Sequence, residues 1–543
     1  MDRRLELVSN QGDYLWALLP EIVLALGAMA VLLGDVMQKG NASRPSARWV
    51  PWASLAVLAA TFVANIPLIT QTLAADPLRD VENGMVAVDA FRGLTNCLFL
   101  LSGAMTVLIS VGYLDRRGIN RGEFYALVLF AVLGMMLMAG ASDLMMVFIG
   151  LEVMSVAIYV LVGFDRMDPR STEASLKYFL LGAFTSAIFL YGIAMVFGAT
   201  GSTNIRGIFP LLLSGQRSEP MLLAGIGLVL VGFGFKVAAI PFHMWTPDAY
   251  EGAPTPVTAL MATGVKAAAF ASLIRVFLVG FSGNFGDWAR PMYLIAAITM
   301  VAGNLLAMTQ GSLKRMLAYS SIAHAGYLLA AVLAGYAGGG AAFLFYLLVY
   351  TLMTAGAFGI IIANARGTDE RVTLEDYAGL ASQKPWLAAM LSIFLLSLAG
   401  FPLTAGFLGK LYILRALVRL GVPSLAVILV LASLVSYFYY LRVIVVMYMR
   451  PARSADDHAE ARLSGPAFAG VATAAALVVL LFFTAGIKGG VMTWAEHGER
   501  SLFAWAQQGL QPAVPEHPQL QTSPQPERQV RPRPETQTQA LAR

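Results

Sequence analysis

The chain has 543 residues, of which 58% are hydrophobic and only 13% are charged, and its formal net charge is +5. Soluble domains carry about 25% charged residues, so this composition excludes an ordinary soluble protein. Apolar runs of about twenty residues, long enough for helices to cross a bilayer, recur along most of the chain. The runs do not alternate as membrane β-strands do, and the small net charge is interpreted as loop asymmetry rather than a nucleic-acid surface.

The apolar runs predict an all-α polytopic membrane protein with about fourteen transmembrane helices. The segment 204–215 is too short to cross and is expected to form a surface helix or loop. From about Gln507 onward Pro, Gln and Arg dominate, and this composition predicts a disordered tail. In chain order the expected spans are 14–36, 49–73, 86–113, 122–140, 142–164, 173–199, 220–245, 255–279, 291–309, 315–335, 341–364, 384–418, 423–449 and 466–487.

Two of these spans are interrupted in a similar way. Span 7 carries Lys236 in its middle and then Pro241, and span 12 carries Pro402 and then Lys410. Because the two spans lie five apart, they start from opposite sides of the membrane, and such paired broken helices are typical of inverted-repeat transporters. We therefore expect two inverted five-helix repeats, spans 4–8 and spans 9–13, with helices 7 and 12 broken. The expected divisions are an N-terminal three-helix segment (1–120), the first repeat (121–280), the second repeat (281–450), a C-terminal helix region (451–506) and the tail (507–543).

The short loops predict the orientation of the chain. The loops after odd-numbered spans hold more Lys and Arg than the N-terminus and the loops after even-numbered spans. Cytoplasmic loops carry such an excess, so we expect the odd-numbered set to be cytoplasmic and both termini to be periplasmic. The loop after span 7, which holds no cation, does not contribute to the bias.

Four titratable residues, Glu152, Lys236, Lys266 and Lys410, lie inside apolar runs. A charge there costs roughly 2.5–3.5 kcal/mol on insertion scales. Lysine and glutamate side chains titrate closer to neutral pH when they are buried, so these residues are candidate proton-transfer sites. The alternative interpretation is a static buried ion pair that only fixes helix packing.

Two histidines are further candidates. His243 follows Lys236 by seven residues, nominally on the same helix face, although Pro241 disturbs that face. His324 lies among small and hydroxyl-bearing residues. Histidine titrates near neutrality and can relay protons, but a buried histidine satisfied by one hydrogen bond is an equally good interpretation of each.

Other features argue for structural roles or exclude chemistry. Arg92, Arg275 and Arg442 stay charged and are expected to pair with a carboxylate or to reach a lipid headgroup. Cys97 is the only cysteine, so an intrachain disulfide, an iron–sulfur cluster and a cysteine-rich zinc site are excluded. We expect no metal site in this chain.

Three stretches closely resemble the antiporter-like subunits of respiratory complex I. They are "FKVAAIPFHMWTPDAYEGAPTPVTALMATGVKAAAFASLIRVF" (235–277), "SLKRMLAYSSIAHAGYLL" (312–329) and "GFPLTAGFLGKLYIL" (400–414), in matching order and at the expected spans. The resemblance covers about residues 10–490. Within the family, the lysine at 410 favours one branch over a sister branch that has glutamate there. A second sister branch has a long C-terminal helix, and nothing after residue 487 looks like one.

The resemblance implies a membrane-arm subunit of proton-translocating NADH:quinone oxidoreductase in a bacterial inner membrane, surrounded by other membrane-arm subunits. Glu152 matches the family's span-5 glutamate, paired with Lys236, and Lys266 matches the connecting lysine of span 8. Lys410 matches the span-12 lysine near the outlet, and His324 falls on the polar axis between them. NADH, FMN, iron–sulfur clusters and quinone are expected on other subunits, so the implied role is proton movement rather than electron transfer.

Two alternatives remain open at this point. A subunit of a multi-subunit cation/proton antiporter would share the fold and the lysines, although the sequence of 245–277 favours complex I. A structural membrane scaffold that moves nothing would tolerate neutralisation of Lys236 or Lys410.

Overall fold

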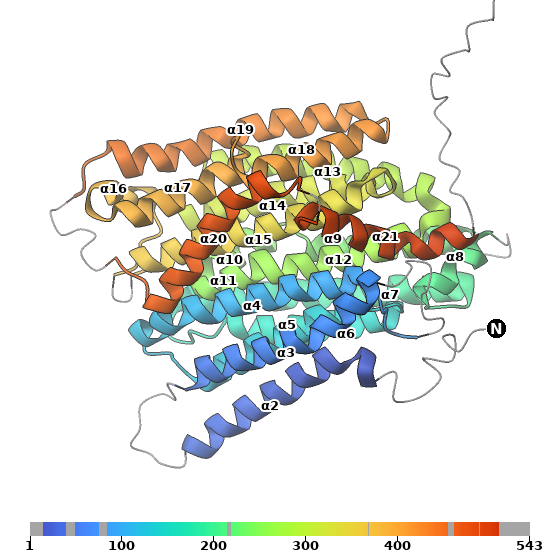
Figure 1. Cartoon of the computed structure of the whole chain (residues 1–543), viewed down its shortest axis with the longest axis horizontal. Helices are drawn as coiled ribbons and strands as arrows, with labels where there is room; N and C mark the ends of the chain where they lie inside the picture. The colour runs from blue at the N-terminus through green and yellow to red at the C-terminus, as the bar shows by residue number, and fades with distance from the viewer. Residues whose placement is uncertain are drawn as a thin grey trace, which may run out of the picture.

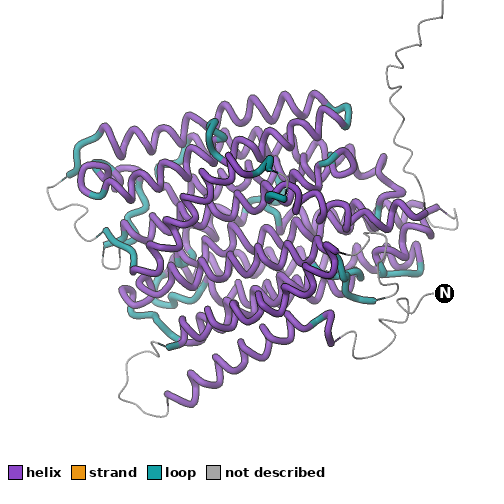
Figure 2. The backbone as a smooth tube through the Cα atoms, viewed as in Figure 1, coloured by secondary structure: helices purple, strands orange, loops and turns teal. Residues whose placement is uncertain are grey.

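The computed structural model describes residues 15–39, 49–74, 84–213, 219–366, 369–453, 461–487 and 489–509. Within these ranges the chain forms helices and loops and no strand (Figure 2). The predicted tail lies, beyond Gly509, outside the described residues. The α-helices are α2 (Leu19–Lys39), α3 (Val50–Ala74), α4 (Ala90–Arg117), α5 (Gly122–Ala139), α6 (Leu144–Val162), α7 (Pro169–Thr200), α8 (Ile205–Leu213), α9 (Glu219–Lys236), α10 (Trp245–Gly252), α11 (Thr255–Leu260), α12 (Lys266–Arg275), α13 (Phe285–Met308), α14 (Leu313–Leu333), α15 (Gly339–Asn364), α16 (Leu380–Gln383), α17 (Pro385–Ala399), α18 (Ala405–Arg419), α19 (Pro423–Met449), α20 (Gly465–Thr484) and α21 (Val491–Gly509).

Among the described residues, thirteen helical segments are long and apolar enough to cross a membrane. The remaining predicted span, span 12, consists of two short helices, α17 and α18, separated by a break. The expected all-α polytopic architecture is thereby confirmed. The segment that was too short to cross forms the short helix α8, as expected.

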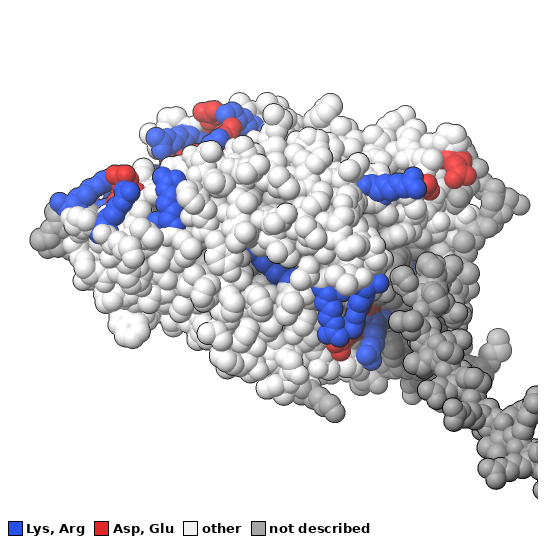
Figure 3. All heavy atoms as spheres, turned by 90° about the horizontal axis from the view of Figure 1, so that it is seen from above, with Lys and Arg blue, Asp and Glu red and all other residues white. Residues whose placement is uncertain are grey.

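Most helices run roughly parallel to the long axis of the molecule and lie side by side, with α2 at one edge and α19 at the opposite edge (Figure 1). The most deeply buried segments are Thr255–Gly280, Leu313–Leu333 and Gly339–Asn364, which have nearly all their side chains inside the protein. These three segments are spans 8, 10 and 11. Most of the surface visible in Figure 3 is uncharged, and charged side chains gather mainly toward the two ends, as expected for a protein with an apolar belt.

Two short backbone pairings reveal the inverted repeats. Asp143, just before α6, pairs with Asn204, just after α7, while Ser312, just before α14, pairs with Thr373, after α15. The first pairing joins spans 5 and 6, and the second joins spans 10 and 11. The same pairing therefore occurs at equivalent positions five spans apart, and on opposite faces of the bundle.

The two broken helices also correspond. In span 7 the helix stops at Lys236 and resumes at Trp245, and in span 12 it stops at Ala399 and resumes at Ala405. Each break contains a non-glycine residue in the left-handed region, Ala238 with φ 60° and Leu403 with φ 72°. Non-glycine residues rarely adopt this conformation, which costs about 1–3 kcal/mol. Both breaks are therefore built features that the surrounding packing enforces.

Two details differ from the sequence-based expectations. Lys236 is the last residue of α9 rather than a residue in the middle of a helix, because the helix ends five residues before Pro241. A further helix, α21, follows residue 487 and packs against α4 and α15. This 19-residue helix is amphipathic and carries several charges, so its sequence does not form an apolar run.

Candidate functional site

Lys236 lies at the carboxyl end of α9 and reaches α6. Its ammonium donates to the Ser155 hydroxyl at 2.8 Å and to the Tyr159 hydroxyl at 3.3 Å. Glu152 belongs to the same helix, one turn before Ser155, but the ammonium of Lys236 binds Ser155 and Tyr159 instead, and the buried Oε1 atom of Glu152 has no hydrogen-bond partner. The structure thus places Glu152 and Lys236 where α9 meets α6, without a direct bond between the two side chains.

Lys266 connects the two repeats in the middle of the bundle. Its ammonium donates to the backbone carbonyl of Ser321 at 2.9 Å and to the hydroxyl of the same residue at 2.7 Å. Lys266 follows directly after a π-helical turn, Met261–Val265, and such turns frequently occur at functional sites. Ser321 belongs to α14, so the lysine of the first repeat is held by a helix of the second.

His324 lies one turn beyond Ser321 on α14 and contacts two tyrosines. Its Nδ1 atom is 2.7 Å from the Tyr346 hydroxyl, and its Nε2 atom is 3.3 Å from the Tyr440 hydroxyl. The Tyr440 hydroxyl also bonds to Ser320. His324 is therefore more than a histidine satisfied by one bond, because both of its ring nitrogens join a network of hydroxyl groups.

Lys410 belongs to α18 and reaches back across the break in span 12. Its ammonium donates to the carbonyls of Leu398 and Ala399 at 3.0 and 2.9 Å, and it lies 4.8 Å from the centre of the Tyr327 ring. Leu398 and Ala399 are the last residues of α17. The free carbonyls at a helix C-terminus carry partial negative charge, so the break itself supplies the acceptors for this lysine.

Lys236 and Lys410 consequently share an electrostatic setting. Lys236 ends α9, and Lys410 binds the end of α17. Both α9 and α17 are the first halves of broken helices, and they run in opposite directions. Half-helix ends of this kind bind coupling ions in transporters.

Lys236, Lys266 and Lys410 share one property. In the described part of the chain, each ammonium binds only hydroxyl or carbonyl oxygens, and none has a carboxylate within ion-pair distance. A buried ammonium without a counter-charge costs several kcal/mol. This arrangement differs from a static buried ion pair. It suits a group that can both bind and release a proton.

The other predicted residues occupy different settings. His243 lies half-buried in the break of span 7, where its Nδ1 atom has no partner and the ring makes no contact with Lys236. Arg92 pairs with Glu21 at 2.8 Å, and Arg275 pairs with Asp89 at 2.5 Å. These two buried pairs confirm the structural interpretation of the arginines. Arg442 is exposed on α19.

The sequence analysis missed a polar cluster around Glu370, in the loop after α15. Its carboxylate accepts hydrogen bonds from Tyr113 of α4, Thr255 of α11 (2.9 Å) and Lys314 of α14 (2.9 Å), and it pairs with Arg117 at 3.3 Å. Burial raises the pKa of the Glu370 carboxyl, but the Lys314 ammonium and the hydrogen bonds outweigh this effect and hold the pKa at about 2. Glu370 therefore stays charged and ties the N-terminal segment to both repeats.

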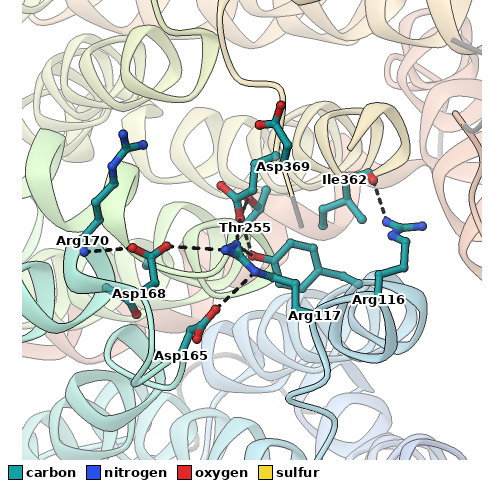
Figure 4. A network of polar contacts seen from close by, with 12 residues as sticks. Arg116, Arg117, Asp165, Asp168, Arg170, Thr255, Ile362 and Asp369 are labelled. Atoms are coloured by element: carbon teal, nitrogen blue, oxygen red, sulfur yellow. Dashed lines mark hydrogen bonds and ion pairs between the residues drawn. The ribbon is translucent and has the colours of Figure 1, made fainter. Parts of the chain in front are cut away.

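Arg117 extends the cluster around Glu370 to the loop between α6 and α7. Its guanidinium lies 3.2 Å from Asp165 and 3.5 Å from Asp168, and Figure 4 shows it pointing between these two carboxylates. No sequence motif marks this cluster, because its members come from segments more than 200 residues apart. From sequence alone, a charged residue in a predicted loop is expected to be exposed to solvent.

Comparisons with known proteins identify the class. Residues 141–436, which contain both broken helices and the lysines Lys236, Lys266 and Lys410, match the family described as NADH:quinone oxidoreductase/Mrp antiporter, transmembrane. The chain is thus an antiporter-like membrane protein. The structure of the Mrp complex from Dietzia sp. matches with a TM-score of 0.75 at 22% identity, over 90% of this chain and 98% of that one, and this likeness shows the shared fold alone.

More similar relatives identify the family. NADH-quinone oxidoreductase subunit N of Trichlorobacter lovleyi is 45% identical over 441 residues, which cover 81% of this chain and 88% of that protein. A chain of respiratory complex I from Thermus thermophilus matches with a TM-score of 0.71 at 36% identity, over 87% of this chain and 98% of that chain. The chain belongs to the subunit N family of NADH-quinone oxidoreductase, which is the branch expected from Lys410.

Proposed function

We propose that this chain is a proton-translocating membrane subunit of NADH:quinone oxidoreductase, which couples electron transfer from NADH to quinone in other subunits to proton transport. The observation that carries the proposal is the row of three buried lysines that bind only neutral oxygens. Each of these side chains can bind and release a proton without breaking a fixed ion pair. The family to which the chain belongs supports the same role.

The geometry suggests an order for the proton-transfer groups. Glu152 and Lys236 lie in the first repeat, Lys266 crosses to Ser321 of the second, and His324 lies one turn further along α14. Lys410 is the last lysine of the row and stands beside the break in span 12. A change at Glu152 would alter the field at Lys236, whose proton would move toward Lys266 and His324, while Lys410 releases one outward. His243, which contacts none of these groups, has at most an accessory role in this scheme.

The partners and cofactors follow from this role. The chain would lie among other membrane-arm subunits, in contact with lipid and with water. NADH, FMN, the iron–sulfur clusters and quinone would bind to those other subunits, so this chain would belong to a proton-translocating oxidoreductase without holding its redox centres.

The proposed location is the bacterial inner membrane, with both termini on the periplasmic side. The excess of Lys and Arg in the loops after odd-numbered spans supports this orientation. Under it, the Glu370 cluster faces the cytoplasm. Reporter domains fused to each terminus would test the assignment, and cytoplasmic reporter activity at either end would overturn it.

The function is tested by replacing Lys410 with Met in the assembled complex and measuring NADH-driven proton uptake into inverted membrane vesicles. We expect a large loss of proton uptake per NADH oxidised, with the complex still assembled. Lys177→Met is the matched control, because Lys177 is exposed on α7 and pairs with Glu173 and Asp248 at the surface. Wild-type proton yield in the Lys410 variant would overturn the proposal and favour a structural scaffold.

A further inference from the structure

A cleft of about 490 Å³ opens where α18 ends and α15 begins, and α21 forms one of its walls. The face on which it opens is opposite to the Glu370 cluster, since α14 runs from that cluster toward the beginning of α15. Under the proposed orientation this face is periplasmic. The polar lining includes Tyr412, Arg415 and Arg419 from α18 and Glu496, Glu499 and Arg500 from α21.

The cleft extends close to the level of Lys410. Tyr412, in its wall, follows Lys410 by two residues on α18. The Tyr346 ring, which contacts His324, packs directly on Gly409, so that a Cβ atom added there would lie 2.3 Å from the ring. Gly340, beside the cleft, precedes Tyr346 by six residues, or about 9 Å along the axis of α15. The proton-transfer row and the cleft are thus separated by less than two helical turns.

Glu499 is the partly buried acidic side chain in the lining of the cleft, whereas Glu496 is exposed. Its Oε1 atom accepts the backbone N–H of Gly340 at 3.0 Å, in the first turn of α15. A helix N-terminus stabilises a carboxylate, so the side chain is fixed in place and can still be ionised. On the other side of α21, Gly498 packs against the apolar side chains of Leu94 and Leu344. Glu499 therefore lies between the protein interior and the cleft.

We propose that Glu499 is a proton-release group at the outer end of the pathway. It would accept a proton released from the Lys410 end of the row, and then donate this proton to water in the cleft and return to the carboxylate. This inference rests on the proposed function, and it assigns α21 a part in proton release that none of the sequence motifs indicated.

The electrostatics of the cleft agree with this role. Burial, with a smaller contribution from Glu496, raises the pKa of Glu499 to about 7, against the lowering effects of the Gly340 and Ala341 amides and of Arg500. Such a group changes its protonation state near neutral pH. The guanidinium groups of Arg415 and Arg419 cannot carry protons, and their positive charge at the cleft disfavours the return of protons from outside.

The test uses the intact complex in inverted vesicles, in which the periplasmic face lines the lumen. The rate of NADH-driven proton uptake is measured with the outer pH fixed and the lumen pH varied between about 6 and 8.5, on either side of a neutral titration. We expect the wild-type rate to fall as the lumen pH drops through about 7, where Glu499 stays protonated. In Glu499→Gln, which keeps an oxygen for the Gly340 N–H, this dependence should be lost and the rate should be low throughout.

Two further variants make the test specific. Glu496→Gln removes an exposed acid from the same cleft and should keep the lumen-pH dependence, with only a small downward shift of its midpoint because Glu496 contributes to the raised pKa of Glu499. Glu499→Asp should keep a lumen-pH dependence with a shifted midpoint. A wild-type profile in Glu499→Gln would overturn the inference, and so would an equal loss of pH dependence in Glu496→Gln. If Glu499→Gln does not assemble, a midpoint in Glu499→Asp identical to the wild type would overturn it. Lys410→Met is measured in parallel. If the proposed function is wrong, this variant keeps its proton uptake; if only the role of Glu499 is wrong, the Lys410 variant still loses proton uptake.

Discussion

Lys266 and Ser321 join the two repeats at the centre of the bundle, through hydrogen bonds of 2.9 Å to the carbonyl and 2.7 Å to the hydroxyl. One residue of α14 thus supplies both acceptors for the ammonium. The hydroxyl can be removed by mutation while the carbonyl remains, so the energetic role of this contact is open to measurement.

Ser321→Ala should impair proton transport without preventing assembly. A hydrogen bond to a charged group is worth about 1.5–3 kcal/mol, so we expect a reduction of about tenfold or more in the coupled proton-uptake rate. Ser392→Ala is the control, because the Ser392 hydroxyl bonds only to the carbonyl one turn earlier in its own helix. Equal rates in the two variants would contradict a special role for Ser321.

The contacts of Lys236 predict an order of effects on α6. Ser155→Ala removes an acceptor at 2.8 Å, and Tyr159→Phe removes one at 3.3 Å, near the limit for a hydrogen bond. We expect the serine variant to lose more proton uptake per NADH than the tyrosine variant, measured in the same vesicles. The reverse order would show that the Tyr159 hydroxyl is the principal partner.

Glu370→Gln should destabilise the assembled protein by about 3–5 kcal/mol, since it leaves the buried Lys314 without its counter-charge. The double variant Glu370→Gln/Lys314→Met should recover part of this loss. Thermal unfolding in detergent provides the measurement. A double variant less stable than either single variant would argue against the pair as the source of the effect.

The same cluster predicts a pH dependence. The pKa of Glu370 is about 2 in the folded protein, below the ordinary value of about 4.3. A carboxyl whose pKa is lowered by folding stabilises the protein fully above its ordinary value, and this stabilisation is lost as the pH falls toward 2. The stability difference between the wild type and Glu370→Gln should therefore be constant from about pH 8 to 5 and shrink only below about pH 4. A difference that changes near neutral pH would point to another titrating group.

Gly406→Ala should disrupt the break in span 12. A Cβ atom there would lie 1.9 Å from the Ser397 carbonyl oxygen, which must move, together with the neighbouring carbonyls that hold Lys410. We expect loss of proton transport or of assembly, measured by vesicle assays and by native gels. Gly227→Ala is the control, because no atom lies within 4 Å of its added Cβ, and a wild-type phenotype in both variants would contradict the prediction.

The sequence predicted those features that hydropathy and residue type determine. Apolar runs marked the spans, and lysines within such runs marked the candidate site. The helix partners were not predictable, because the helices that carry Lys266 and His324 are buried on all sides, and a helix that is apolar all round has no face that identifies its neighbour. For this reason the sequence did not predict that Ser155 and Ser321 bind the lysines.

The remaining misses have a different physical origin. Pro241 suggested a break in span 7, but the helix ends already at Lys236, where tertiary packing holds Ala238 in a left-handed conformation. Glu370 gains its partners only when its loop meets three helices from distant parts of the chain, α4, α11 and α14. Glu499 lies on an amphipathic helix that is too polar to be recognised as a span. Tertiary contacts determined each of these features, and local sequence could not reveal them.

The matched settings of Lys236 and Lys410 have a consequence for the direction of transport. Each lysine stands at the carboxyl end of a half-helix, and neither forms an ion pair within the described residues. In the proposed function, a proton that moves from Lys236 to Lys410 leaves and reaches similar settings, so these two lysines by themselves impose no direction. Under the proposed function, the direction would come from the other subunits of the complex or from the membrane potential, and a sufficiently large potential should drive proton movement through the same groups in reverse.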